Sequence, residues 1–241
     1  MDSWITVKTA DGPMRSYVAR PSGRAGPHPG LVVFMEAYGV NAYVKSVCDR
    51  LADAGYTALA PELFHRTGTH IEIEYSDRPK LMAALAGVTN AQIEEDAGAA
   101  VAALRAMPEV DPKRIGAIGF CMGGFATVLT GLTTAVGAIV AFYPGMLVAP
   151  RPGLQLTPII DQIPKLAAAT QIHYGSADAG ISADDRAAVQ RALDASKCVH
   201  QVLVHDGAEH GFHSHDRASY HPQAAEEAWH ETLGWFKENL A

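Results

Sequence analysis

The chain has 241 residues, of which 48% are hydrophobic and 19% are charged, so it can form a large core and is not globally disordered. The formal net charge is -7, and no dense run of lysine and arginine occurs. This balance argues against a nucleic-acid groove or an anionic membrane surface as a partner.

Cysteine usage and the start of the chain predict a cytoplasmic protein. Cys48, Cys121 and Cys198 are odd in number and far apart, which favours reduced thiols over a disulfide framework. The first residues lack the basic head and apolar stretch of a secretory signal. The longest apolar region, residues 135–143, is shorter than the roughly 20 residues of a membrane-spanning helix. We therefore expect no membrane association.

Hydrophobic periodicity predicts an N-terminal hairpin followed by alternating strands and helices. The hairpin strands cover residues 5–9 and 16–19. The later elements are predicted in this order: strand 31–35, helix 42–54, strand 56–60, helix 92–107, strand 115–120, helix 122–132, strand 136–142, strand 170–174, helix 183–195, strand 201–204 and helix 222–240.

This alternation predicts a single α/β domain over residues 1–241, with a mostly parallel central sheet and helices on both faces. Ligands in such folds bind at the carboxyl ends of the strands. Residues 62–80 fit neither period, and we expect them to form a loop over that edge.

A cysteine lies where a predicted strand gives way to a helix, in the stretch GAIGFCMGGF at residues 116–125. Such a turn can hold Cys121 in a strained conformation above the sheet, and Gly119 and Gly123 leave room for it. The N-terminus of the following helix favours a thiolate. The alternative is an ordinary buried cysteine.

A nucleophile of this kind needs a base and a group that orients the base. The order nucleophile, acid, histidine is typical of α/β-hydrolases, and Asp178 and His210 follow predicted strands in that order. Asp206 is a rival acid, although it lies on the same short loop as His210. The other histidines that compete for the role of base are His213, His215 and His221.

An oxyanion hole is expected from two backbone N–H groups, those of Met122 and Ala37. Ala37 follows strand 31–35 in the stretch MEAYGVN. Glu36, directly before it, places a carboxylate at the predicted active-site edge. A solvated charge at a strand end is the alternative for Glu36.

Four motifs together resemble the dienelactone hydrolase (carboxymethylenebutenolidase) family: MEAYGVN at 35–41, GFCMGG at 119–124, YGSAD at 174–178 and AEHGF at 208–212. The resemblance runs from about Gly30 to the end of the chain. It implies an α/β-hydrolase fold, hydrolysis of a small ester or lactone, and no metal or organic cofactor.

By this resemblance Cys121 is the nucleophile, His210 the base and Asp178 its partner, and Glu36 holds the thiol protonated at rest. The resemblance also implies substrate contacts from arginines. Ser214 stands where the family's archetype has one of them, and Arg217 is the nearest arginine. The remaining candidates for substrate contact are Arg78, with Arg66 as its neighbour, together with Tyr38 and Phe212.

Two other classes of function remain open from the sequence. His210, His213 and His215 could ligate zinc in a metal-dependent hydrolase, although no HExxH helix or cysteine pair accompanies them. The fold could also carry a non-catalytic ligand-binding or redox-sensing protein that uses Cys121.

Overall fold

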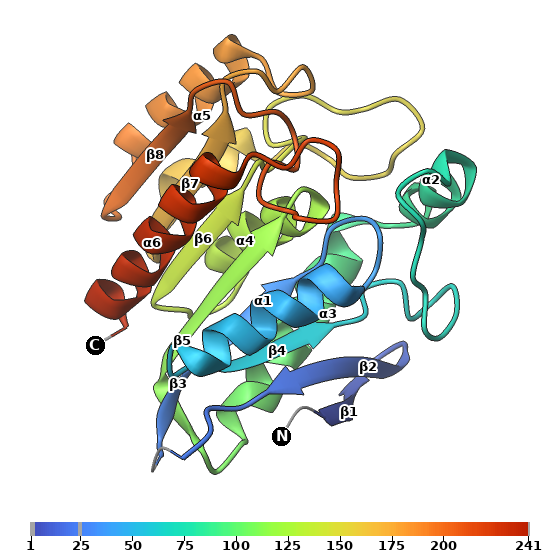
Figure 1. The fold of residues 1–241 in the computed structure, drawn as a ribbon, viewed down its shortest axis with the longest axis vertical. Helices are drawn as coiled ribbons and strands as arrows, with labels where there is room; N and C mark the ends of the chain where they lie inside the picture. The colour runs from blue at the N-terminus through green and yellow to red at the C-terminus, as the bar shows by residue number, and fades with distance from the viewer. Residues whose placement is uncertain (1–2, 24–25, 241) are drawn as a thin grey trace.

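The computed structural model describes residues 3–23 and 26–240, which build an eight-stranded sheet between two layers of helices (Figure 1). The strands, in sheet order, are β1 (Ser3–Thr9), β2 (Gly12–Ala19), β4 (Thr57–Pro61), β3 (His28–Phe34), β5 (Val110–Phe120), β6 (Ala138–Phe142), β7 (Ala169–Gly175) and β8 (His200–His205). β1, β2 and β4 pair antiparallel, and every pairing from β4 onward to β8 is parallel. The predicted fold class is confirmed.

Helices cover both faces of the sheet. They are α1 (Ala42–Asp53), α2 (Arg78–Ala86), α3 (Asn90–Arg105), α4 (Met122–Thr133), α5 (Ala183–Asp194), α6 (Pro222–Asn239) and the short 3-10 helix η1 (Ile160–Lys165). In Figure 1, α1 and α6 lie on the near face, whereas α3, α4 and α5 lie behind the sheet. β6 and β7 are buried along their whole length, and β6 is accordingly apolar throughout, whereas β7 also buries Thr170, Gln171 and His173.

Every predicted strand and helix has a counterpart, with ends that differ by a few residues. β5 differs most, because it begins at Val110 rather than at residue 115. Local capping fixes several helix starts: Asn41 accepts from the Val44 N–H at the start of α1, and Thr89 forms a capping box with Gln92 in α3.

Two elements were absent from the prediction, α2 and η1. The segment predicted as a loop is irregular up to Asp77, but α2 begins at Arg78. Asp77 caps this helix by accepting from the Lys80 N–H. The apolar residues of α2 are consecutive rather than spaced along one face, so no helical period marks it.

The irregular segment is fixed to the body of the molecule at both of its ends. His65 and Arg66 both bind Asp96, which is 1% exposed, on α3. Further on, Gly39 has φ +87°, and a Cβ there would lie 1.9 Å from the Ile71 oxygen. Only glycine therefore allows the segment to cross so close to the chain after β3.

Within residues 3–23 and 26–240, no helix combines the length and apolar character needed to cross a bilayer.

Candidate active site

Cys121 occupies the sharp turn between β5 and α4, at the carboxyl edge of the sheet. Its backbone has φ 57° and ψ −116°, a sparsely populated conformation for a residue with a side chain. The two flanking glycines make the turn possible. A Cβ on Gly119 would meet the Gly123 oxygen at 2.1 Å, and one on Gly123 would meet the Phe34 oxygen at 2.3 Å.

His210 and Asp178 reach the same edge from the loops after β8 and β7. Asp178 Oδ2 lies 2.7 Å from His210 Nδ1, and its other oxygen accepts from the Gly180 N–H at 2.8 Å. The Asp178 side chain is fully buried. Because Nδ1 is held by the carboxylate, Nε2 is the ring nitrogen left to face the sulfur. The rival acid Asp206 instead accepts from Ser176.

The electrostatics of the three groups favour a thiolate–imidazolium pair. Burial raises the pKa of Cys121, but the charge and hydrogen bond of His210 outweigh it, and the net pKa is lowered. Burial likewise lowers the pKa of His210, whereas the charge of Cys121 and the hydrogen bond to Asp178 raise it to about 10. For Asp178, burial raises the pKa, but the His210 hydrogen bond brings it below its usual value.

Glu36 lies two residues after the end of β3 and is completely buried. Its Oε1 accepts from Arg217 Nη1 at 3.1 Å, while Oε2 has no hydrogen-bond partner among the described residues. Burial raises the pKa of Glu36 despite the opposing charge of Arg217. The charge of Glu36 raises the pKa of Cys121, as expected of a group that opposes the thiolate, but His210 acts more strongly in the other direction.

A buried polar cluster extends behind Glu36 toward the core. It contains the hydroxyls of Tyr143 and Tyr43, and Tyr43 Oη lies 2.7 Å from His213 Nδ1. The Tyr143 ring packs on His210 with centroids 5.0 Å apart. The two tyrosines could not be found from the sequence, because they come from a helix and a strand end with no motif of their own.

His213 does not lie on a surface loop as a competitor of His210. It is 2% exposed, and burial lowers its pKa to about 3, so it stays neutral. His215 is half exposed and lies near Asp216. Among the described residues, no group of three or more His, Cys, Asp or Glu is placed to hold a metal ion. The geometry therefore does not support the three-histidine zinc site.

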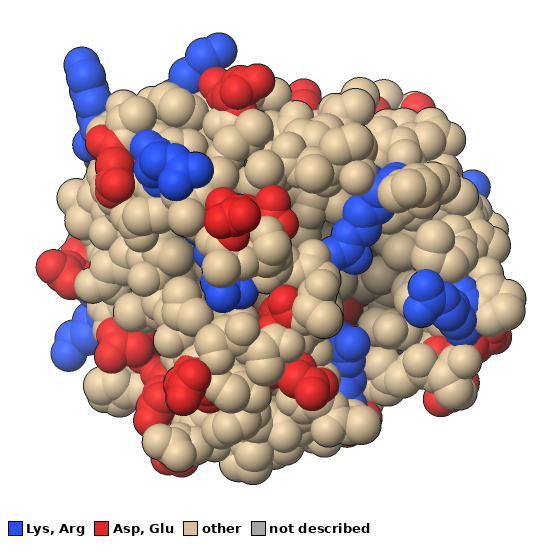
Figure 2. Space-filling view, turned by 90° about the horizontal axis from the view of Figure 1, so that it is seen from above, with Lys and Arg blue, Asp and Glu red and all other residues tan. Residues whose placement is uncertain are grey.

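Two adjoining cavities flank His210. The first, of about 370 Å³, contains Cys121 together with Ala37 and is bordered by α2. The second, of about 620 Å³, contains Asp178. Tyr38, Arg151, His210 and Arg217 line both. Seen from the carboxyl ends of the strands, the surface is hollowed, and basic side chains border the hollow (Figure 2).

The expected substrate contacts divide into those at the cavities and those elsewhere. Tyr38 and Arg78 line the cavity of Cys121, as predicted. Phe212 does not contact it: the side chain is fully buried and packs on Tyr143 and His205. Arg66 is bound to Asp96, outside both cavities.

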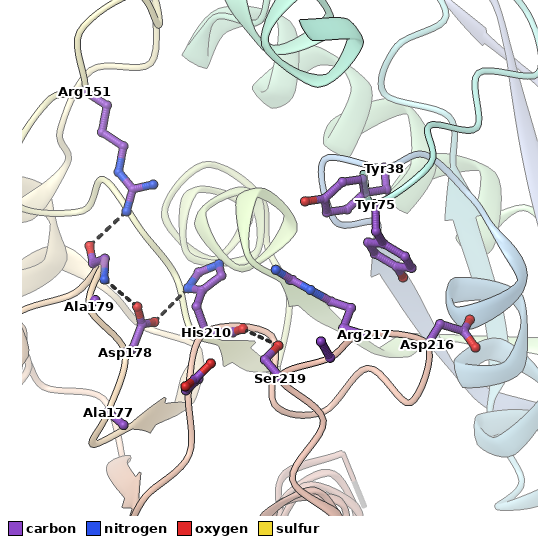
Figure 3. A pocket seen from close by; sticks show the side chains of 13 residues that line it. Tyr38, Tyr75, Arg151, Ala177, Asp178, Ala179, His210, Asp216, Arg217 and Ser219 are labelled. Carbon is purple, nitrogen blue, oxygen red and sulfur yellow. Dashed lines mark hydrogen bonds and ion pairs between the residues drawn. The ribbon is translucent and has the colours of Figure 1, made fainter. Parts of the chain in front are cut away.

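Arg217 and Arg151 border the cavities, although the sequence analysis noted Arg217 only as the arginine nearest to Ser214 and did not consider Arg151. Arg217 extends toward His210 beneath Tyr38 and Tyr75, and Arg151 donates to the Gly180 carbonyl at 2.9 Å (Figure 3). Arg217 could have been found from its place seven residues after His210. Arg151 follows β6, so its only signal was a position beyond the carboxyl end of a strand.

The model of the dienelactone hydrolase family matches residues 14–240, nearly the whole chain. The chain belongs to this family. A family relative from Synechocystis, named "Putative carboxymethylenebutenolidase", is 30% identical over 98% of this chain and 96% of its own length. One from Methylorubrum extorquens with the same name is 34% identical over 97% and 80%. The crystal structure of a "Putative Dienelactone Hydrolase" from Klebsiella pneumoniae has a TM-score of 0.90 and 32% identity, covering 99% of this chain and 98% of that one.

Family membership confirms the resemblance that the four motifs predicted. As a dienelactone hydrolase family member with this fold, the chain is a hydrolase that acts on ester or lactone bonds.

Proposed function

We propose that this family member cleaves its ester or lactone substrate through a Cys121–His210–Asp178 triad and a covalent acyl-enzyme. The observation that carries the proposal is the 2.7 Å contact between Asp178 and His210, beside a cysteine on a strained strand–helix turn. This is the arrangement of nucleophile, base and orienting acid that acyl transfer requires.

In acylation, the Cys121 thiolate attacks the carbonyl carbon and forms a carbon–sulfur bond. The negative charge passes to the carbonyl oxygen, which the N–H groups of Met122 and Ala37 would receive. Met122 is the first residue of α4, and N–H groups in the first turn of a helix have no partner within the helix. Ala37 lines the same cavity as Cys121.

The tetrahedral intermediate collapses by breaking the carbon–oxygen bond to the alcohol, which takes its proton from the His210 imidazolium. In deacylation, neutral His210 removes a proton from water, and the hydroxide attacks the thioester carbon. Breaking the carbon–sulfur bond releases the acid and restores the thiolate. Glu36, through its charge and its bond to Arg217, sets how strongly the thiolate is favoured before substrate arrives.

Substitution of the triad residues tests this proposal. Cys121→Ala and His210→Ala should each lower kcat for a small activated ester by several orders of magnitude, as removal of a triad member usually does. Cys198→Ala is the matched control, because Cys198 is buried elsewhere and should keep wild-type turnover. Turnover by Cys121→Ala at the wild-type rate would contradict the triad.

A redox sensor on this fold would need the reactive thiol only. The close Asp178–His210 contact, and the cavity that admits a ligand to Cys121, favour catalysis over sensing alone.

A further inference from the structure

The cavity that contains Cys121 has an apolar wall. Leu81, Met82 and Leu85 of α2 form one side, and Pro152 and Leu154, from the loop after β6, form the other. The three α2 side chains and Leu154 are only partly buried, so they leave apolar surface facing the cavity. Desolvating such surface is what binds a hydrocarbon group. We name this cavity the α2 chamber.

The second cavity differs in chemistry. Apart from the residues it shares with the α2 chamber, its wall includes the carboxylates of Glu209 and Asp216, the hydroxyls of Tyr75 and Ser219, and no large aliphatic side chain. Such a wall can accept and donate hydrogen bonds to a hydroxylated group and offers little apolar surface. We name this cavity the polar chamber.

The catalytic residues are divided between the chambers. Cys121 lines only the α2 chamber, whereas His210 lines both. In the mechanism above, the acyl group stays bonded to Cys121 and the alcohol leaves with the proton of His210. The acyl group must therefore lie in the α2 chamber, and the alcohol has room to depart through the polar chamber.

We propose that the preferred substrate is an ester of an apolar acid of several carbons with a hydrophilic, hydroxyl-bearing alcohol; this inference rests on the proposed function. The acyl group is held against α2, and the alcohol lies in the polar chamber. α2 is thus the specificity element for the acyl group. Met82 is the most informative residue, because it lines the chamber, is partly exposed and makes no part of the triad.

A series of esters with one alcohol and the acids acetate, butyrate and hexanoate tests the acyl assignment. In the wild-type enzyme, kcat/KM should rise roughly fourfold for each added methylene, since burying one contributes about 0.8 kcal/mol. Met82→Glu places a charge in the chamber and should abolish most of this rise, measured as the ratio of kcat/KM for hexanoate to that for acetate. Ala83→Glu is the matched control: Ala83 is exposed on the same helix and lines neither cavity, so the rise should persist.

The outcomes separate this inference from the proposed function. Turnover that survives Cys121→Ala unchanged would refute the triad itself. If turnover depends on Cys121 but does not rise with chain length, only the assignment of the acyl group to the α2 chamber is wrong. The same conclusion follows if Met82→Glu lowers turnover equally for all three esters. An equal effect of Ala83→Glu would also overturn it, because the charge would then act without entering the chamber.

The polar chamber has its own test with the acyl group fixed as hexanoate. The wild-type enzyme should turn over the glycerol ester with a higher kcat/KM than the hexanol ester, and Asp216→Leu should bring the ratio of the two kcat/KM values to about one. A preference for the hexanol ester, or a glycerol preference that Asp216→Leu leaves unchanged, would refute the assignment of the alcohol to this chamber.

Discussion

At the scale of single residues, the pKa of Cys121 depends on burial and on the charged groups around the sulfur. His210 favours the thiolate, Glu36 opposes it, and burial opposes it as well. Because His210 has the stronger effect, its contact with Asp178 also influences the protonation state of Cys121. The carboxylate stabilises the imidazolium, and the imidazolium stabilises the thiolate.

The pH dependence of alkylation tests the contribution of His210. Since the pKa of Cys121 is lowered and that of His210 is raised to about 10, the thiolate–imidazolium pair should exist from below the ordinary cysteine pKa up to about pH 10. Alkylation by iodoacetamide should therefore reach its plateau early in a pH titration. In His210→Ala the midpoint should move upward, because burial and Glu36 then act unopposed by the ring. A midpoint that does not move would contradict the pairing.

The raised pKa of His210 also makes the free energy of unfolding depend on pH. The raised pKa of His210 means that the folded state binds the proton more tightly than the unfolded state, so this stabilisation is full below the unfolded histidine pKa of about 6.5 and is lost as pH rises through about 10. Urea unfolding of the wild type and His210→Ala across this window should show the difference between them shrinking at high pH. A constant difference would argue against the linkage.

Glu36→Gln should make the resting thiol more reactive. Removing the carboxylate charge removes one cause that raises the pKa of Cys121, so more thiolate is present at a pH below its midpoint. We expect alkylation to speed up by up to about tenfold, the effect of one pKa unit. Glu209→Gln is a suitable control, because Glu209 lines only the polar chamber and is not among the causes of the Cys121 shift. Slower or unchanged alkylation of Glu36→Gln would contradict the proposal that the Glu36 charge disfavours the thiolate.

At the scale of elements, α2 and the irregular segment before it border the pocket without belonging to the regular sheet. Their attachment depends on Asp96, whose two oxygens accept from Arg66 at 2.7 and 3.0 Å while one also contacts His65. This attachment could not be predicted from the sequence, because it joins loop residues to one carboxylate in the middle of an amphipathic helix. The strands and the α-helices other than α2 could be predicted, because burial on one face or both leaves a period in the sequence.

Asp96→Asn should destabilise the fold strongly. It leaves Arg66 largely buried with its main partner neutralised, and breaking a buried ion pair typically costs about 3 to 5 kcal/mol. Urea denaturation should report a loss near the lower end of that range. Asp111→Asn should cost much less than Asp96→Asn, because its pair with Arg114 is more exposed and is screened by solvent. Equal losses in the two variants would show that Asp96 has no special role.

At the scale of the whole molecule, one edge of the sheet gathers residues that are far apart in sequence. Glu36, Cys121, Asp178 and His210 each follow a different parallel strand, so the topology alone brings them together. This is why motif order was enough to predict the family and to place the candidate residues at one edge of the sheet. The lining of the cavities was less predictable, because Arg151, Arg217 and the α2 residues come from segments whose paths depend on tertiary packing.

The charge distribution of the molecule bears on its substrate. The chain carries a net charge of -7, yet basic side chains, among them Arg78, Arg151 and Arg217, border the hollow over Cys121. We expect Arg78→Gln to lower kcat/KM about tenfold for an ester whose acyl chain ends in a carboxylate, relative to a neutral ester of the same length, and added salt to shift this ratio for the wild-type enzyme in the same direction. Kinetics with the matched ester pair at two ionic strengths would check this. Equal effects on both esters would assign Arg78 a structural role instead.

Trapping the acyl-enzyme tests the central mechanism most directly. Intact-protein mass spectrometry after rapid acid quench of the wild-type enzyme with a slowly deacylating ester should reveal one acyl group per chain, and peptide mapping should place it on Cys121. Cys121→Ala should carry none. Steady turnover of that ester with Cys121 unmodified throughout the reaction would contradict covalent catalysis by this cysteine.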